Sequence, residues 1–200
     1  MNDPKNGFKK TTITGTNFND NVDLYNYVKK DGDTPVAVTK PVDLNGKEIK
    51  KFNINTNKGN DTIVGSNVDD VINAGDGDDT IILTNGADTI TGGKGTNTLL
   101  SSNLDTDDKY VTYKLTKDEK LLFDYIGSYP SFEIIGKDVY VTSSSGYKKL
   151  KIVNATDKAY QGDIWFWDSA DPNKEGYSLE EVSFIPYEYS KNWTGTRFDE

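Results

Sequence analysis

The amino-acid sequence predicts an all-β protein whose short strands wind into a parallel coil. Three observations lead to this prediction: a nine-residue period between Thr56 and Leu100, turns rich in Gly and Asn within that period, and strand-like alternation on both sides of it. Each repeat supplies one turn and one short strand with a single inward side chain. Two repeats complete one circuit, so we expect turns two repeats apart to stack.

The period consists of five nonapeptides without a gap, TNKGNDTIV, GSNVDDVIN, AGDGDDTII, LTNGADTIT and GGKGTNTLL. Glycine is frequent at positions 1, 2 and 4, which suits a tight turn with residues at positive φ. Position 8 is always a large aliphatic residue. Position 6 carries Asp61, Asp70, Asp79, Asp88 and Asn97.

The composition restricts the chemistry that the chain can carry out. Its 200 residues have a net charge of -9 and include no Cys and no His. Thiolate and imidazole metal sites, disulfides and His-dependent nucleophiles are therefore excluded. An acidic surface disfavours nucleic acid and anionic lipids as partners. The metal ligands that remain are oxygen atoms, which suit Ca²⁺ or Mg²⁺.

Stacking of the repeats brings the carboxylates of position 6 together. Asp61 is expected above Asp79 and Asp79 above Asn97, with Asp70 above Asp88 on the other side. Carboxylates one strand spacing apart repel each other unless a cation lies between them. Two carboxylates and about four main-chain carbonyls make a six-coordinate oxygen cage, which suits Ca²⁺ better than the more rigid Mg²⁺.

With these residues, the block resembles the RTX (repeats-in-toxin) nonapeptide G-G-x-G-x-D-x-U-x, where U is a large aliphatic residue. The likeness is strong over Thr56–Leu100. It implies a right-handed parallel β-roll that binds about three to four Ca²⁺ ions. The alternative is a charged loop without metal.

The resemblance also implies a ligand set, with carbonyls at positions 2 and 4 and the Asp of one turn facing carbonyls at positions 1 and 3 and the Asp of the next. A first ion would use Asn57, Gly59, Asp61, Ala74, Asp76 and Asp79. A second would use Ser66, Val68, Asp70, Leu83, Asn85 and Asp88. A third would use Gly75, Gly77, Asp79, Gly92, Lys94 and Asn97. Because Val68 and Leu83 replace glycines, we expect strain at the second site. Because Asn97 lacks charge, we expect a weak third site or the end of the array.

Residues 1–55 are interpreted as an N-terminal flank with an interrupted repeat. Gly15–Asp23 reads GTNFNDNVD and matches the period, and Leu24–Asn55 then breaks it with an insertion expected to form a surface hairpin. If the coil resumes in register, Asp20 meets Asp61 and forms a fourth ion site. Its carbonyl ligands would come from Thr16, Phe18, Thr56 and Lys58. The alternative is a solvated Asp20 in a flank that is draped on the coil.

Residues 101–200 are interpreted as a β-rich cap that continues the two sheets after the repeat block, residues 56–100. Alternating strands are expected at Tyr110–Leu115, Phe132–Ile135, Asp138–Thr142 and Lys148–Val153, with a helix at Thr116–Tyr125. Trp165 and Trp167 would share one face of a strand. They are assigned either to the core of the cap or to a platform that stacks against a sugar ring.

The expected function is that of a non-enzymatic, calcium-dependent folding module from a secreted or surface RTX protein. The resemblance implies type I secretion by a Gram-negative bacterium, with the secretion machinery as a partner of the parent protein. No apolar stretch is long enough for a membrane span, and no N-terminal signal peptide is visible. The alternatives are a calcium-supported adhesin that binds a cell-surface glycan and the non-catalytic tail of an exported enzyme. The parent protein could be an adhesin, a toxin or an S-layer protein.

Overall fold

The computed structural model describes residues 8–27, 36–37, 40–100, 109–117, 119–124, 130–143, 149–155, 164–167 and 177–178. These residues form strands and turns and no helix. Within these ranges, therefore, no helix is long and apolar enough to cross a membrane. The prediction of an all-β chain is confirmed.

The strands follow one another in chain order with short turns through the repeat block. They are β1 (Thr12–Thr14), β2 (Asn21–Asp23), β3 (Asn26–Tyr27), β4 (Val36–Ala37), β5 (Lys51–Asn55), β6 (Thr62–Val64), β7 (Asp69–Asp76), β8 (Thr80–Ile82), β9 (Thr89–Leu100), β10 (Tyr110–Lys114), β11 (Glu119–Asp124), β12 (Pro130–Ile135), β13 (Asp138–Ser143), β14 (Lys149–Val153), β15 (Ile164–Trp167) and β16 (Tyr177–Ser178).

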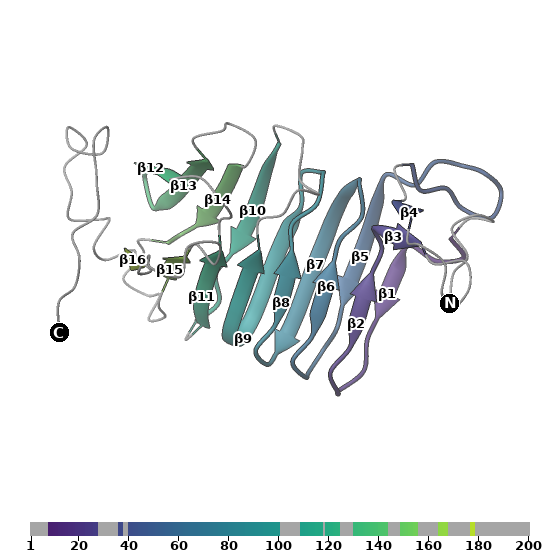
Figure 1. The fold of residues 1–200 in the computed structure, drawn as a ribbon, viewed down its shortest axis with the longest axis horizontal. Coiled ribbons are helices and arrows are strands. Elements are labelled where there is room, and N and C mark those ends of the chain that lie inside the picture. Colours follow the sequence, from purple (N-terminus) through teal and green to yellow (C-terminus); the bar gives the residue numbers. More distant parts are fainter. Residues whose placement is uncertain are drawn as a thin grey trace.

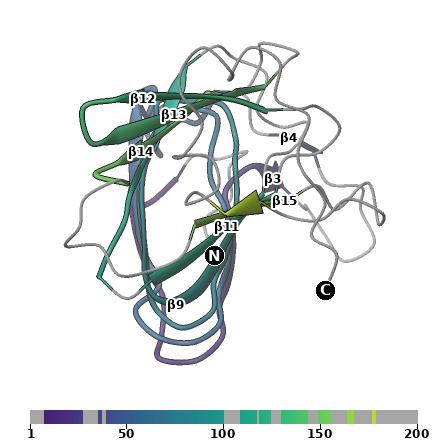
Figure 2. The same cartoon turned by 90° about the vertical axis from the view of Figure 1, so that its left-hand side faces the viewer.

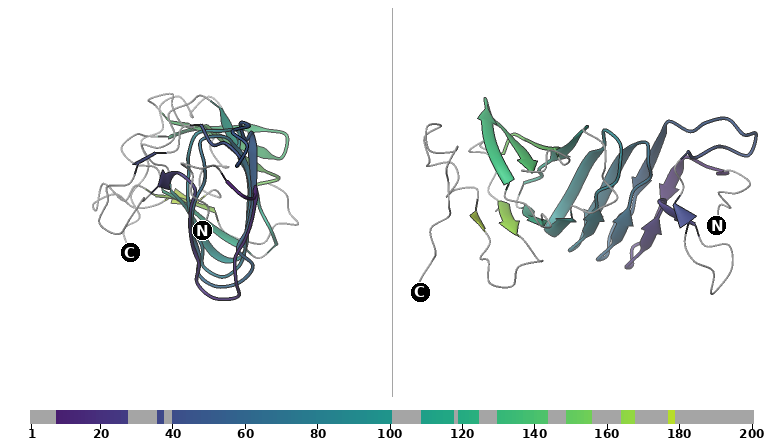
Figure 3. Two further views of the ribbon diagram at one scale, coloured as in Figure 1. Left: turned by 90° about the vertical axis from the view of Figure 1, so that its right-hand side faces the viewer. Right: turned by 45° about the horizontal axis from the view of Figure 1, so that its top comes forward.

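The chain winds between two sheets that meet at the long strand β9 (Figure 1). The first sheet has the order β1-β5-β7-β9-β10-β14-β13-β12, and the second has the order β2-β6-β8-β9-β11-β15-β16. Pairing is parallel from β1 to β10 and β14 in the first sheet and from β2 to β11 and β15 in the second. Viewed along the coil, successive turns lie over one another (Figures 2 and 3).

The side chains of position 8 fill the space between the two sheets. In the first sheet Ile54 pairs in register with Ile72, and Ile72 with Ile90. In the second sheet Ile63 pairs with Ile81, and Ile81 with Leu99. All six belong to one buried apolar cluster. The two-repeat circuit expected from the sequence is therefore confirmed, because each partner is 18 residues from the last.

Glycines at positions 2 and 4 allow successive turns to touch. Gly75 has φ +114°, and a Cβ there would lie 1.9 Å from the carbonyl oxygen of Asn57 in the turn before. Gly93 has φ +104°, and a Cβ there would lie 1.8 Å from the oxygen of Gly75. No side chain fits at these distances, so the repeat needs glycine both for its φ and for the close approach.

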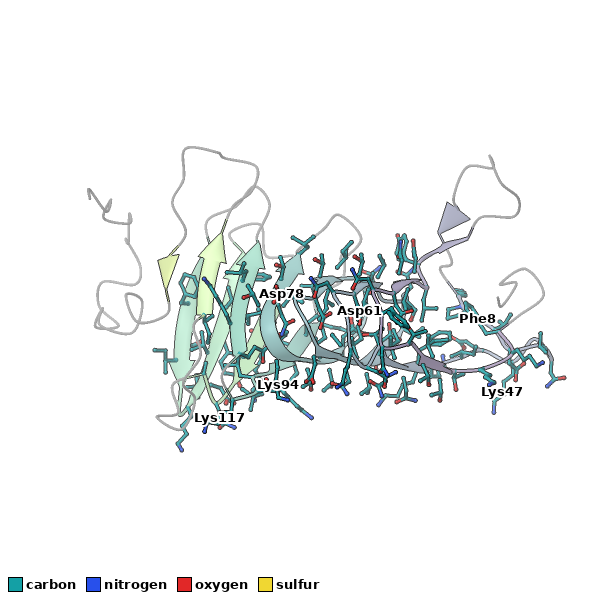
Figure 4. The ribbon with its side chains drawn as sticks, turned by 90° about the horizontal axis from the view of Figure 1, so that it is seen from below. Phe8, Lys47, Asp61, Asp78, Lys94 and Lys117 are labelled. Carbon is teal, nitrogen blue, oxygen red and sulfur yellow. The ribbon has the colours of Figure 1, made fainter. Side chains whose placement is uncertain are left out.

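The insertion replaces one turn of the coil and closes its N-terminal end. It leaves β2 at Asp23 and returns at Lys51 in β5, and it contains the antiparallel pair β3–β4 and a second turn in which Val42 pairs with Glu48. Ile49 is buried, and the rings of Phe8 and Phe52 meet edge to face with centroids 4.9 Å apart. Figure 4 shows Phe8 and Lys47 at the end of the coil opposite Lys117. The insertion is thus more than a surface hairpin, since it covers apolar side chains.

The cap continues both columns of inward side chains. Tyr113 of β10 follows Ile90, Phe123 of β11 follows Leu99, and all four are buried. The prediction of a helix at Thr116–Tyr125 is wrong, because strand β11 occupies Glu119–Asp124 of this segment. The side chain of Glu119 does accept a hydrogen bond from the amide of Thr116, as in a helix capping box. The alternation of Leu121 and Phe123 toward the core decides in favour of a strand.

We predict that Gly75→Ala destabilises the folded chain far more than Gly46→Ala. Both glycines have positive φ, but a Cβ on Gly46 would meet nothing within 4 Å. Gly46→Ala should cost about 1 kcal/mol from backbone strain alone, and Gly75→Ala about 3 kcal/mol or more from strain plus overlap with the turn before. Urea unfolding at saturating Ca²⁺ measures both values. Equal losses would show that the turns are not in contact.

Candidate metal centre

The residues of position 6 form two columns, one at each edge of the flattened coil. The first column consists of Asp20, Asp61, Asp79 and Asn97 and leads into the second sheet. The second consists of Asp70 and Asp88 and leads into the first sheet. Except for Asp20, which is partly exposed, these side chains are no more than 2% exposed. Figure 4 shows Asp61 within the stack of turns.

Each column is connected by hydrogen bonds from a backbone amide to the next carboxylate or carboxamide. In the first column the amide of Asp20 donates to Oδ1 of Asp61 at 2.8 Å, and that of Asp61 donates to Oδ1 of Asp79 at 2.9 Å. The amide of Asp79 donates to Oδ1 of Asn97 at 3.1 Å. In the second column the amide of Asp70 donates to Oδ1 of Asp88 at 2.8 Å. One oxygen of each acceptor is thereby fixed.

The second oxygen is without a partner at two neighbouring rungs. Among the described residues only three buried side-chain polar atoms lack a hydrogen bond: Oδ2 of Asp61, Oδ2 of Asp79 and Oγ1 of Thr84. A buried carboxylate oxygen without a donor is strongly destabilising unless a cation satisfies it. The pair Asp61 and Asp79 therefore fits a divalent ion that binds oxygen.

The main-chain ligands expected for the first ion surround the same pair. The oxygen of Asn57 accepts from the amide of Asp76 at 2.9 Å, and the oxygen of Asp76 accepts from the amide of Gly59 at 3.0 Å. Ala74 accepts a bond from the hydroxyl of Thr56 at 2.8 Å. A carbonyl oxygen has two lone pairs, so each of these keeps one for a metal. All six residues of the first predicted site lie in two stacked turns.

The second predicted site is also assembled, but its first carboxylate is already bonded. Ser66 donates its amide to Oδ2 of Asp70 at 2.6 Å, and its hydroxyl lies 2.9 and 3.0 Å from the two carboxylate oxygens. Asn85 bonds to Asn67, in the same place of the turn before. Of the two residues that replace glycines at this site, Leu83 is a buried core residue at 2% exposure, and Val68 packs against the core.

The third predicted site ends in a cluster that sequence reasoning missed. Nδ2 of Asn97 donates to Oε1 of Glu119 at 3.0 Å and to the oxygen of Gly93 at 3.3 Å. Glu119, which is fully buried, also accepts from the hydroxyl of Tyr113 and from the amide and hydroxyl of Thr116. Gly77, Gly92 and Lys94, three predicted ligands of the third site, lie in the stacked turns. The side chain of Lys94 lies outside these turns and forms an ion pair with Asp76 at 3.3 Å.

The fourth predicted site depends on the coil resuming after the insertion, and it does. β2 pairs with β6 so that Val22 lies opposite Ile63. Asp20 is consequently next to Asp61 rather than solvated in a separate flank. Its own Oδ2 accepts from the amide of Thr16 at 2.6 Å, while Phe18 is 79% exposed. Lys58 and Thr56 lie in the turn that follows.

The proposed sugar platform cannot be followed in the structure, because the side chains of Trp165 and Trp167 lie outside the described part. Their strand β15 pairs with β11, with Trp165 opposite Leu122. Over the ranges described, no group of three or more acidic side chains converges on one point. An ion in the described part of the coil would therefore have at most two carboxylates among its ligands, with main-chain oxygens as the others.

A comparison with known families agrees with this geometry. The family model described as the RTX calcium-binding nonapeptide repeat, with four copies, matches residues 55–90 and again residues 64–99. The repeat block, residues 55–99, matches this RTX repeat and makes up less than half of the chain. It is thus a calcium-binding module of the RTX type, and calcium is the ion that the stacked turns bind. No curated protein and no solved structure matches the chain.

The raised pKa values of two carboxylates in the RTX block show the cost of burying their charge, which a bound cation would offset. Burial raises the pKa of Asp70 and of Asp79 from 3.8 to about 6. At Asp79 the like charges of Asp61, Asp78 and Glu119 contribute to the same rise in pKa. Ionised at neutral pH, both carboxylates therefore oppose folding unless donors or a cation compensate.

The raised pKa values predict opposite effects of pH on the two states of the block. Without metal, the protonated carboxyls favour the fold below the unfolded pKa of 3.8, and this contribution is lost as the pH rises through about 6. The chain in EDTA should thus retain more structure at pH 4.5 than at pH 7.5. Calcium affinity should fall as the pH drops below about 6, since protons compete for the same oxygens. Circular dichroism and calcium titrations at several pH values check both; a pH-independent affinity would contradict the assignment.

A second prediction concerns Glu119, which ends the first column. Glu119→Ala removes from a buried cluster the acceptor that Tyr113, Asn97 and Thr116 share, and should cost about 3 kcal/mol or more. Tyr113→Phe removes only one bond of the cluster and should cost about 1 kcal/mol. Urea unfolding of both variants at saturating Ca²⁺ measures the difference. A smaller loss in Glu119→Ala than in Tyr113→Phe would contradict the buried cluster.

Proposed function

We propose that this chain is a calcium-dependent folding module of a secreted or surface RTX protein. The observation that carries the proposal is the buried pair of unpartnered carboxylate oxygens on Asp61 and Asp79. Without a cation, two adjacent turns of the coil hold like charges in a place that water cannot reach. Folding and calcium binding are then one event, since the site does not exist in the unfolded chain.

This coupling suits a protein that crosses membranes before it folds. At low calcium the chain stays unfolded, and extracellular calcium in the millimolar range then supplies the missing charge. The net charge of -9 adds repulsion to the metal-free state. These features support export by a type I system, as is typical of RTX proteins of Gram-negative bacteria, and a location outside the cell.

In this proposal the chain performs no catalytic step. It has no Cys and no His, and its buried carboxylates belong to the stack of turns. The parent protein would be an adhesin, a toxin or an S-layer protein that carries the block, or an exported enzyme that carries it as a tail. The sequence next to the block in the parent protein distinguishes these candidates.

We predict that removal of calcium unfolds the coil. In EDTA at pH 7.5 the far-UV circular dichroism should be largely that of a disordered chain, and Ca²⁺ should restore the β signal cooperatively at about 0.1–1 mM. Mg²⁺ at the same concentrations is the control and should restore little, because it needs a rigid octahedron. An unchanged spectrum and an unchanged Tm in EDTA would overturn the proposal.

A further inference from the structure

The sequence contains three Asn-Gly pairs, and the structure places two of them in different environments. Asn45–Gly46 lies in the insertion and Asn85–Gly86 lies in a turn of the coil, while Asn6–Gly7 is outside the described residues. An asparagine that precedes a glycine is especially prone to spontaneous deamidation, because glycine has no side chain to keep its amide away from the carboxamide before it. The surroundings of each pair therefore decide whether it reacts.

The reaction needs no reagent other than water. The amide nitrogen of the glycine loses its proton and attacks Cγ of the asparagine, which closes an imide ring while the Cγ–Nδ2 bond breaks and ammonia leaves with that proton. Water then opens the ring. Cleavage at Cγ gives aspartate. Cleavage at the main-chain carbonyl gives isoaspartate, in which the main chain runs through the side chain and is longer by one carbon. No atom is oxidised or reduced.

In the folded coil both reacting groups of Asn85–Gly86 are held in place. Nδ2 of Asn85 donates to Oδ1 of Asn67 in the turn before, at 3.0 Å. Gly86 is buried with φ +125°, and a Cβ there would lie 2.6 Å from the carbonyl oxygen of Val68. The backbone of the glycine thus lies against the preceding turn and is shielded from water. Closure of the imide would have to break both contacts.

The pair in the insertion lacks this protection. Asn45 and Gly46 are exposed, and a Cβ on Gly46 would meet nothing within 4 Å. Their amides donate to Asp43 of the same turn, that of Gly46 to its carbonyl oxygen at 2.9 Å and that of Asn45 to its Oδ1 at 2.8 Å. Because these bonds are local, the turn opens without any unstacking of the coil. Asn45–Gly46 is therefore an internal reference for the reaction.

Given the proposed function, in which the coil is folded only with calcium, we infer that Asn85–Gly86 is a deamidation site that the calcium-loaded coil protects and the metal-free chain exposes. Unfolding separates Asn85 from Asn67 and Gly86 from Val68, and the pair then reacts as an Asn-Gly pair in a flexible chain does. The extent of reaction at Asn85 accordingly reports the time that the chain has spent without calcium.

Isoaspartate at position 85 does not fit the stacked turn. Asn85 and Asn67 occupy the same place in turns 18 residues apart, and Gly86 already touches the turn before, so an additional main-chain carbon has no space. Both products also add a negative charge to a chain whose net charge is -9. A chain that carries isoaspartate at this position should therefore not regain the complete coil when calcium returns.

Peptide mapping by mass spectrometry measures the reaction at each site. The full chain is kept at pH 7.5 and 37 °C in 10 mM Ca²⁺ or in EDTA, and the rate of deamidation is followed in the peptides with Asn85 and Asn45. Calcium should slow the reaction at Asn85 at least about tenfold, equivalent to about 1.4 kcal/mol for local opening of the turn, and should change the rate at Asn45 much less. If calcium slows Asn85 no more than Asn45, the inference is overturned.

Circular dichroism of the same samples separates this inference from the proposed function. A chain that is disordered in EDTA and folded in Ca²⁺, but in which Asn85 reacts equally fast in both, would overturn only the protected site. A chain that is folded in both, with equal rates at Asn85, would overturn the calcium-dependent module as well. Mg²⁺ in place of Ca²⁺ is the ionic control and should leave Asn85 as reactive as in EDTA.

A matched pair of variants tests the consequence for folding. Asn85→Ser and Asn45→Ser each remove one carboxamide, so no imide forms from asparagine at that position. Each variant is aged in EDTA and then given Ca²⁺, and its recovered β signal is compared with that of its own fresh sample. Recovery should decline with age in the wild type and in Asn45→Ser, and much less in Asn85→Ser. An equal decline in all three would overturn the role of isoaspartate at position 85. If Asn85→Ser does not fold, the rates mapped in the wild type decide.

Discussion

The structure depends on carboxylates that are buried one strand spacing apart. Parallel strands lie about 4.8 Å from each other, and every second turn of the coil adds another acidic side chain at that interval. The bonds from backbone amides fix one oxygen of each rung and leave the charge to be balanced separately. Between Asp61 and Asp79, where Oδ2 of each residue lacks a donor, the proposed cation would balance it, whereas at Asp70 the donors of Ser66 offset part of the cost of burial.

The ends of the coil avoid this requirement by replacing the acids with apolar residues. In the first sheet Phe52 lies opposite Asp70 and ends the column on that side. Thr112 lies opposite Thr89, so Val111 takes the place that follows Asp88 in the column. In the second sheet Leu121 lies opposite Asn97, and Ile164 opposite Leu121. All four replacements are buried. The same backbone path is thus held by calcium in its middle and by hydrophobic packing in the insertion and the cap.

Local pattern was sufficient to predict the coil and the strands β10, β12, β13 and β14 of the cap, but not β11. The period fixed the circuit length and the inward residues, because every repeat makes the same contacts as the one before it. The register across the insertion followed from Asp20 and Val22 matching the period. The segment after Thr116 was mistaken for a helix because a back-bonding Glu at the third position is a helix signal, and only the pairing of β11 with β9 makes it a strand.

The sequence by itself determined the fold class and predicted oxygen ligands for a divalent ion, since composition left no other ligand and the repeat places the acids in columns. The resemblance of the repeat to the RTX nonapeptide indicated calcium. Tertiary structure decided which of these buried carboxylates keep an oxygen without a hydrogen-bond donor. Asp70 and Asp79 are equivalent in the repeat, yet Ser66 donates to Oδ2 of Asp70 and no donor reaches Oδ2 of Asp79. It also brought Glu119 to Asn97 from 22 residues away. Such differences arise from hydrogen bonds between side chains and neighbouring turns, whose geometry a linear pattern does not contain.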